Sequence, residues 1–214
     1  MLAFAFAPLH AFAAEEYALW VNGERFTSDK LEIACGEGKA EFDPATNTLT
    51  LTNAAVTSCA NGYGIVSQFS TKLTVAVKGE NSINIPSGGG IVAIADLEFV
   101  LDGNLSIEAG GENYDAVTTL GSITVKGNLE NKQELIANAA VGVGLCCDGA
   151  VTIDAVSFKS KAFYAAIDAG LLFIRNNSYV DVKATDDFRN AIFVGSEEAP
   201  GEIVISKTEM YAES

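Results

Sequence analysis

The chain has 214 residues, of which 49% are hydrophobic, so it is long enough to bury the core of one domain and too apolar to be disordered. Its 28 acidic residues outnumber its 13 lysines and arginines and give a formal net charge of -15. Such a charge repels phosphate backbones and anionic lipid surfaces, so nucleic acid is not an expected partner.

The first residues have the pattern of an export signal. Leu2–Ala13 is an apolar run that ends in Ala11-Phe12-Ala13, a small-residue cleavage pattern, and Glu15 follows. The run is too short to span a bilayer and lacks the basic start of a complete signal. We therefore expect residues 1–13 to be a signal peptide, truncated at its start, and the mature protein to be secreted or at the cell surface without membrane insertion. The alternative is a buried N-terminal element, which Pro8 disfavours because it interrupts the run.

Residues 14–60 have the pattern of an N-terminal cap made of strands and a hairpin. Tyr17–Val21 is predicted to be a strand, and Asn22-Gly23 a turn. Ala40–Phe42 leads through Asp43–Asn47 into Leu49–Leu51, whose alternation places one face inside. The Asp-Pro step starts a turn because proline presets φ and the aspartate can accept backbone N–H groups.

The four cysteines do not match a zinc pattern. Cys35 and Cys59 have neither a Cys-x-x-Cys spacing nor a histidine partner, and Cys146 and Cys147 are adjacent. Export permits a disulfide between Cys35 and Cys59, and small buried thiols are an equally good interpretation. A bridge between the two adjacent cysteines would be strained, so we do not expect one.

From residue 61 onward, short alternating apolar segments recur in sets of three about every 25 residues. The first segment of each set is anchored on Ile65, Ile91, Val117, Val143, Ile167 and Ile192. The second comprises Leu73–Val75, Leu97–Phe99, Ile123–Val125, Val151–Ile153, Leu171–Phe173 and Ile203–Ile205. The third comprises Ile83–Ile85, Leu105–Ile107, Glu134–Ile136, Phe158–Ser160 and Tyr179–Val182.

This repeat predicts an all-β fold, a single-stranded right-handed parallel β-helix of about six to seven coils over residues 61–214, with the cap as part of the same domain. An antiparallel sandwich also has short strands, but it does not repeat its turns every three strands. Asparagines and glycines recur at one corner, where they tolerate a left-handed backbone, and we expect their amides to hydrogen-bond neighbouring coils. These corner segments are Gly79–Asn81, Gly103-Asn104, Gly127-Asn128 and Asn176-Asn177.

Two segments of the cap carry a resemblance. Tyr17–Ser28 and Glu41–Leu51 resemble an N-terminal module of secreted or cell-surface proteins of Gram-positive bacteria. In outline the whole chain is similar to bacterial carbohydrate-binding β-helix domains that bind acidic polysaccharide. The resemblance implies a secreted or surface protein that binds calcium, and it identifies no ligand-contacting residue.

Catalytic motifs are not expected. The histidine of the chain, His10, lies in the predicted signal, and Asp186-Asp187 is the sole fragment of a polygalacturonase-like carboxylate set. A calcium-dependent lyase would need Arg175 or Arg189 as its base beside a carboxylate cluster. We therefore expect a non-catalytic module, with a pectate-lyase-like enzyme as the alternative.

The aromatic residues of the last quarter suggest a glycan site. Rings beside predicted turns could stack on sugar faces, and nearby cations could bind a sugar carboxylate. The candidate ligand-binding residues are Tyr164, Tyr179, Phe188, Lys183 and Arg189. The expected ligand is an acidic polysaccharide or a surface protein, the alternative is a purely structural scaffold, and we expect a monomer.

Calcium is the candidate cofactor, because an acidic protein would bind a polyuronate through a bridging cation. The densest carboxylate pairs in neighbouring coils are the candidate ligands, with solvated acidic turns as the alternative. These residues are Asp186, Asp187, Glu197 and Glu198.

Overall fold

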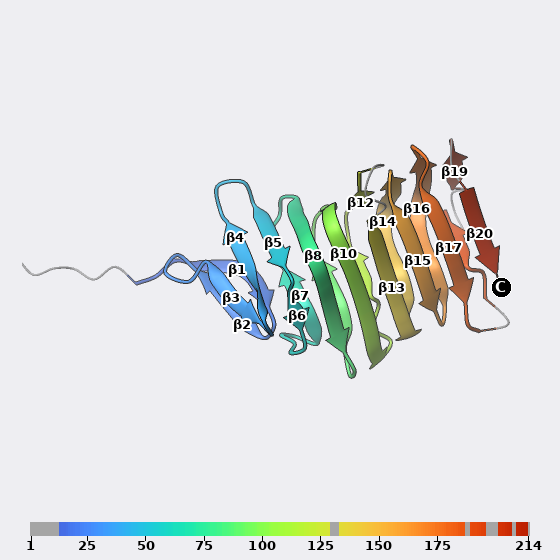
Figure 1. Cartoon of the computed structure of the whole chain (residues 1–214). Coiled ribbons are helices and arrows are strands. Elements are labelled where there is room, and N and C mark those ends of the chain that lie inside the picture. Colours follow the sequence, from blue (N-terminus) through green and yellow to red (C-terminus); the bar gives the residue numbers. More distant parts are fainter. Residues whose placement is uncertain (1–12, 129–132, 187–188, 196–200, 207–208, 214) are drawn as a thin grey trace, which may run out of the picture.

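The computed structural model describes residues 13–128, 133–186, 189–195, 201–206 and 209–213. Within these ranges the chain forms 20 β-strands and no helix, and successive coils stack along one axis (Figure 1). No element of the described part is therefore a helix long and apolar enough to cross a membrane. The prediction of an all-β parallel solenoid is confirmed.

The coils have three faces, each a ladder of parallel strands. Face A contains β7 (Tyr63–Ser67), β9 (Gly89–Ala93), β11 (Val117–Thr119), the first part of β14 (Val143–Asp154), the first part of β16 (Ala165–Arg175) and β18 (Ile192–Val194). Face B contains β5 (Thr48–Thr52), the first parts of β8 (Leu73–Ile85) and β10 (Leu97–Glu112), β12 (Ile123–Lys126), the second parts of β14 and β16, and β19 (Glu202–Ile205). Face C contains β6 (Ala55–Val56), the second parts of β8 and β10, β13 (Glu134–Val141), β15 (Ser157–Ala162), β17 (Tyr179–Ala184) and β20 (Glu209–Glu213).

The cap is antiparallel. It contains β1 (Glu16–Val21), β2 (Glu24–Thr27), β3 (Glu32–Cys35) and β4 (Gly38–Asp43). β1 pairs with β2 and with β7 of face A, while β3, β4 and β5 form a meander whose last strand starts face B. Parallel stacking therefore begins at Thr48, inside the segment that the sequence assigned to the cap.

The turn between β4 and β5 has the predicted chemistry. The Asp43 carboxylate accepts the Ala45 N–H at 2.9 Å and the Thr46 hydroxyl at 2.8 Å, and these bonds lower its pKa. Asn47 adopts a left-handed φ of 52° just before β5. The predicted hairpin is confirmed.

The core consists of columns of inward side chains, one from each coil. On face A the column is Ile65, Ile91, Val117, Leu145, Ile167 and Ile192. The predicted anchor Val143 is wrong, because Val143 pairs with Ala165, one column away, and lies outside the main core cluster. Residues 143 and 145 have the same parity in a strand, so alternation could not separate them. Val117 and Leu145 are 28 residues apart, whereas Ile91 and Val117 are 26 apart, so the register of this coil is displaced by two residues.

Two further registers differ from the prediction. On face B the column residue is Leu172 rather than Leu171, which is 39% exposed. On face C, Ile83 aligns with Ile107, and Leu105 aligns with Asn81. Asn81 is buried in the column because its amide is fully used: Oδ1 accepts the Ala54 N–H, and Nδ2 donates to the carbonyls of Lys78, Gly79 and Asn104.

The corner asparagines act as expected. The Nδ2 of Asn104 donates to Glu80 of the previous coil at 2.8 Å, and its Oδ1 accepts the Glu134 N–H of the next coil at 2.9 Å. Asn176 and Asn177 have left-handed φ values of 55° and 57°. The amide of Asn104 satisfies a backbone N–H group at the corner and holds neighbouring coils together.

All four cysteines are free thiols. Cys35 and Cys147 are buried, Cys146 is half-buried and Cys59 is exposed. Burial raises the pKa of Cys35 and Cys147 to about 11 and that of Cys146 to about 12. The small buried thiol is therefore the correct interpretation of Cys35, which is not bridged to Cys59.

Candidate functional site

The outer side of face C carries a column of polar side chains. Leu105, Ile107 and Ala109 of β10 point into the core, so Glu108 points out. Glu108 aligns with Asn84 of β8 on one side and with Asn138 of β13 on the other. Lys161 of β15 continues the column, and it aligns in turn with Lys183 of β17.

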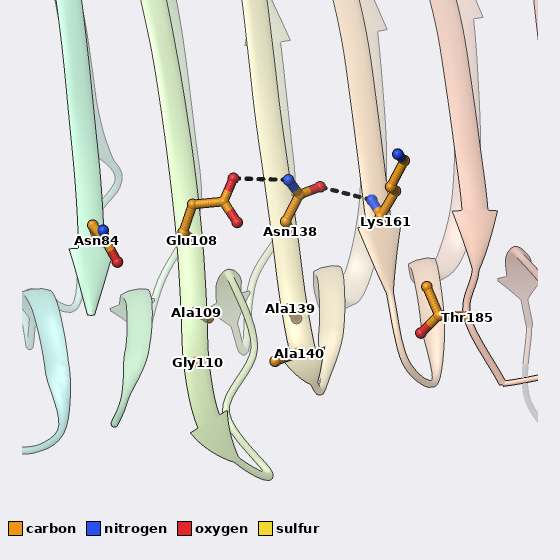
Figure 2. Close-up of a pocket in the computed structure, with 9 residues that line it drawn as sticks. All are labelled: Asn84, Glu108, Ala109, Gly110, Asn138, Ala139, Ala140, Lys161 and Thr185. Carbon is orange, nitrogen blue, oxygen red and sulfur yellow. Dashed lines mark hydrogen bonds between the residues drawn. The ribbon is translucent and has the colours of Figure 1, made fainter. Parts of the chain in front are cut away.

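These residues line a shallow groove of about 310 Å³, near the lower limit for ligand sites (Figure 2). The groove crosses the strands from β8 to the end of β17. Short side chains leave it hollow where the strands end, and longer polar side chains border it. Its lining residues are Asn84, Glu108, Ala109, Gly110, Asn138, Ala139, Ala140, Lys161 and Thr185.

Asn138 is fixed between its neighbours. Its Nδ2 donates to Oε1 of Glu108 at 2.8 Å, and its Oδ1 accepts the backbone N–H of Lys161 at 2.8 Å (Figure 2). The second oxygen of Glu108 accepts no hydrogen bond from the described residues. The groove therefore presents one oriented amide and one carboxylate oxygen that can still accept a hydrogen bond.

Lys161 is the basic residue of the groove lining. Within the described ranges, its ammonium group forms no ion pair or side-chain hydrogen bond. Lys183 aligns with Lys161 on the next coil, but it lies outside the groove lining and has an interaction partner of its own. On face B, in contrast, Glu98 pairs with both Lys126 and Lys72, which lowers its pKa. A lysine left without a carboxylate is unexpected in a chain with a net charge of -15.

Some of the predicted glycan-binding residues lie beside this groove. The guanidinium of Arg189 lies 5.2 Å from the centre of the Tyr164 ring, and its Nε lies 3.6 Å from Oδ2 of Asp186. Asp186 directly follows Thr185 of the groove, and the Tyr164 ring also contacts Phe163, with ring centres 5.1 Å apart. The structure thus brings Tyr164, Arg189 and Asp186 together at one end of the groove.

The other predicted residues are distributed differently. Lys183 belongs to the groove column, whereas Tyr179 lies at the opposite end of β17 and is half-buried. Phe188 and the candidate calcium ligands Asp187, Glu197 and Glu198 lie outside the described residues. The remaining candidate ligand, Asp186, is paired with Arg189, and no three acidic, histidine or cysteine side chains of the described part could hold a metal ion together.

A second polar cluster lies on the outer side of face A. Asp115 accepts the Val143 N–H at 2.8 Å, and its neighbours include Thr118 and Cys146. Asp168 is in register with Cys146 on the next coil. Burial raises the pKa of both carboxyl groups, and the charge of Asp168 raises that of Asp115 further.

Sequence reasoning missed the groove and this acid cluster. Asn84 lies inside the third apolar segment of its coil, whereas Glu108 and Asn138 lie one and two residues beyond the end of theirs, so the sequence signal for them is weak. They align only in the true register, and the predicted register of Leu105 was two residues out.

No protein-family model, curated protein or solved structure matches this chain. Its function must therefore be inferred from its own side chains.

Proposed function

We propose that this chain is a secreted or cell-surface module that binds an acidic polysaccharide along face C and does not cleave it. The observation that carries the proposal is Lys161, a lysine in the lining of a groove that has no carboxylate partner in the described part. A bound carboxylate would accept a charge-assisted hydrogen bond from this ammonium group.

The rest of the groove suits sugar hydroxyl groups. Glu108 offers a carboxylate oxygen that accepts hydrogen bonds, and Asn84 offers an exposed amide that both donates and accepts. At the end of the groove, Phe163 and Tyr164 are half-buried rings beside Thr185. Rings of this kind stack on the apolar faces of sugars.

Lys161 supplies the positive charge in this groove, so the proposed binding needs no bridging calcium. Asp186, the candidate calcium ligand inside the described part, is neutralised by Arg189. We therefore expect binding of acidic polysaccharide to persist in the presence of a chelator and to weaken with added salt, because the contacts are exposed charge pairs.

The test is affinity electrophoresis of the purified protein in gels that contain a neutral, an acidic or a basic polysaccharide. We expect retardation in the acidic gel, and we expect Lys161→Gln to weaken it about three- to tenfold, the range for one charge-assisted hydrogen bond. Lys78→Gln removes the same charge from an exposed position on face B and is the matched control, which should leave binding unchanged. Retention of no polysaccharide would leave a structural scaffold as the function.

A second candidate function is cleavage of the polysaccharide, and the acid cluster on face A favours it. Asp115 and Asp168 are partly buried carboxyl groups with raised pKa values, and general acids in glycosidases have that property. Analysis of reducing ends after incubation with each retained polysaccharide tests it. Product that forms with the unaltered protein and disappears with Asp168→Asn would establish an enzyme.

A further inference from the structure

The groove on face C changes its charge along its length. Glu108 of β10 is acidic, Asn138 of β13 is neutral, and Lys161 of β15 is basic. Glu108 therefore lies two coils before the lysine. A ligand that occupies the whole groove meets a carboxylate at Glu108 and an ammonium group at Lys161.

The spacing of the coils determines which sugar of a bound glycan lies against which coil. Neighbouring strands of a sheet lie about 4.8 Å apart, and the groove crosses the strands, so a chain lying in it passes one coil at each step. This step is close to the length that one sugar adds to an extended glycan. Consecutive sugars then face consecutive coils, in register with Glu108, Asn138 and Lys161.

We infer that the groove selects a linear glycan whose acidic sugars are separated by neutral ones, with the acidic sugar at Lys161 and a neutral sugar at Glu108. The inference rests on the proposed function, and it specifies the ligand of the same site. In a polyuronate every sugar carries a carboxylate, so one of them must lie against Glu108 and be repelled. A neutral sugar at that position donates a hydroxyl group to the open oxygen of Glu108 instead.

The experiment compares two probes at low salt by isothermal titration calorimetry: gellan fragments, which carry one glucuronate in each tetrasaccharide repeat, and polygalacturonate fragments of similar length. We expect the gellan fragments to bind at least several-fold more tightly to the unaltered protein. Glu108→Gln keeps the hydrogen bond with Asn138 possible and removes the charge, so it should tighten polygalacturonate binding about three- to tenfold. A gain in affinity cannot result from misfolding.

The matched control is Glu112→Gln, which removes an exposed carboxylate from the last residue of the same strand, outside the groove lining. Equal gains from Glu108→Gln and Glu112→Gln would show a general charge effect and overturn the inference. Tighter binding of polygalacturonate than of gellan by the unaltered protein would also overturn it and leave the proposed function standing. Binding of neither probe, nor of any polysaccharide in the gel assay, would overturn both.

Discussion

Asp168 shows how a single residue can make the stability of this protein depend on pH. Burial raises the pKa of its carboxyl group, so the folded chain holds the proton to a higher pH than the unfolded chain does. The folded state is therefore favoured below the raised pKa, and this contribution is lost as the pH rises from about 3.8 through the raised value. We expect Asp168→Asn to raise the midpoint of urea unfolding at neutral pH and to have little effect at the acidic end of that window. Asp102→Asn, at an exposed position on β10, should change neither midpoint, and an equal gain from it would assign the effect to net charge.

At the scale of one element, the register of β14 decides which of its residues packs in the core column. Leu145 stands between Val117 and Ile167 in the core column and is fully buried, whereas Val143 lies outside the main core cluster. We expect Leu145→Ala to cost about 2–5 kcal/mol and Val117→Ala about 1–3 kcal/mol in the free energy of unfolding. Val143→Ala should cost clearly less than Val117→Ala, although both remove the same atoms. Urea denaturation gives the three values, and equal costs for the two valines would contradict the register.

For the whole molecule, we expect the cap to protect the start of the solenoid from edge-to-edge association. Phe42 joins the cap to the first coil, since its ring lies 5.6 Å from those of Phe26 and Phe69, centre to centre, and it is almost fully buried. We expect Phe42→Ala to lower the free energy of unfolding by about 3–5 kcal/mol and to produce soluble aggregates in light scattering, because an exposed edge strand pairs with other chains. Phe193→Ala, at a ring that is 45% exposed, should cost little and leave the light scattering unchanged. Aggregation of both variants, or of neither, would show that the cap has no such role.

The sequence by itself determined the features that depend on neighbouring residues. Alternation of apolar and polar residues predicts strands with one buried side, as in Leu49–Leu51, and glycine and asparagine mark the corners because they tolerate left-handed φ. Repetition of these local signals about every 25 residues was enough to predict a parallel solenoid. Aromatic residues beside turns, with cations nearby, separately suggested Tyr164, Tyr179, Phe188, Lys183 and Arg189 as binding residues, and ligand binding by them stays a prediction.

Only the tertiary structure decided which residues of different coils meet. The loops between strands differ in length, so a constant period cannot fix the alignment, and a shift of two residues keeps the same parity and leaves the alternation intact. For that reason Leu145 rather than Val143 fills the core column. Glu108, Asn138 and Lys161 form one groove because the strands stack them in register, although they are far apart in the sequence. The charge pattern of the candidate site is therefore a property of coil stacking, which no local signal in the sequence encodes.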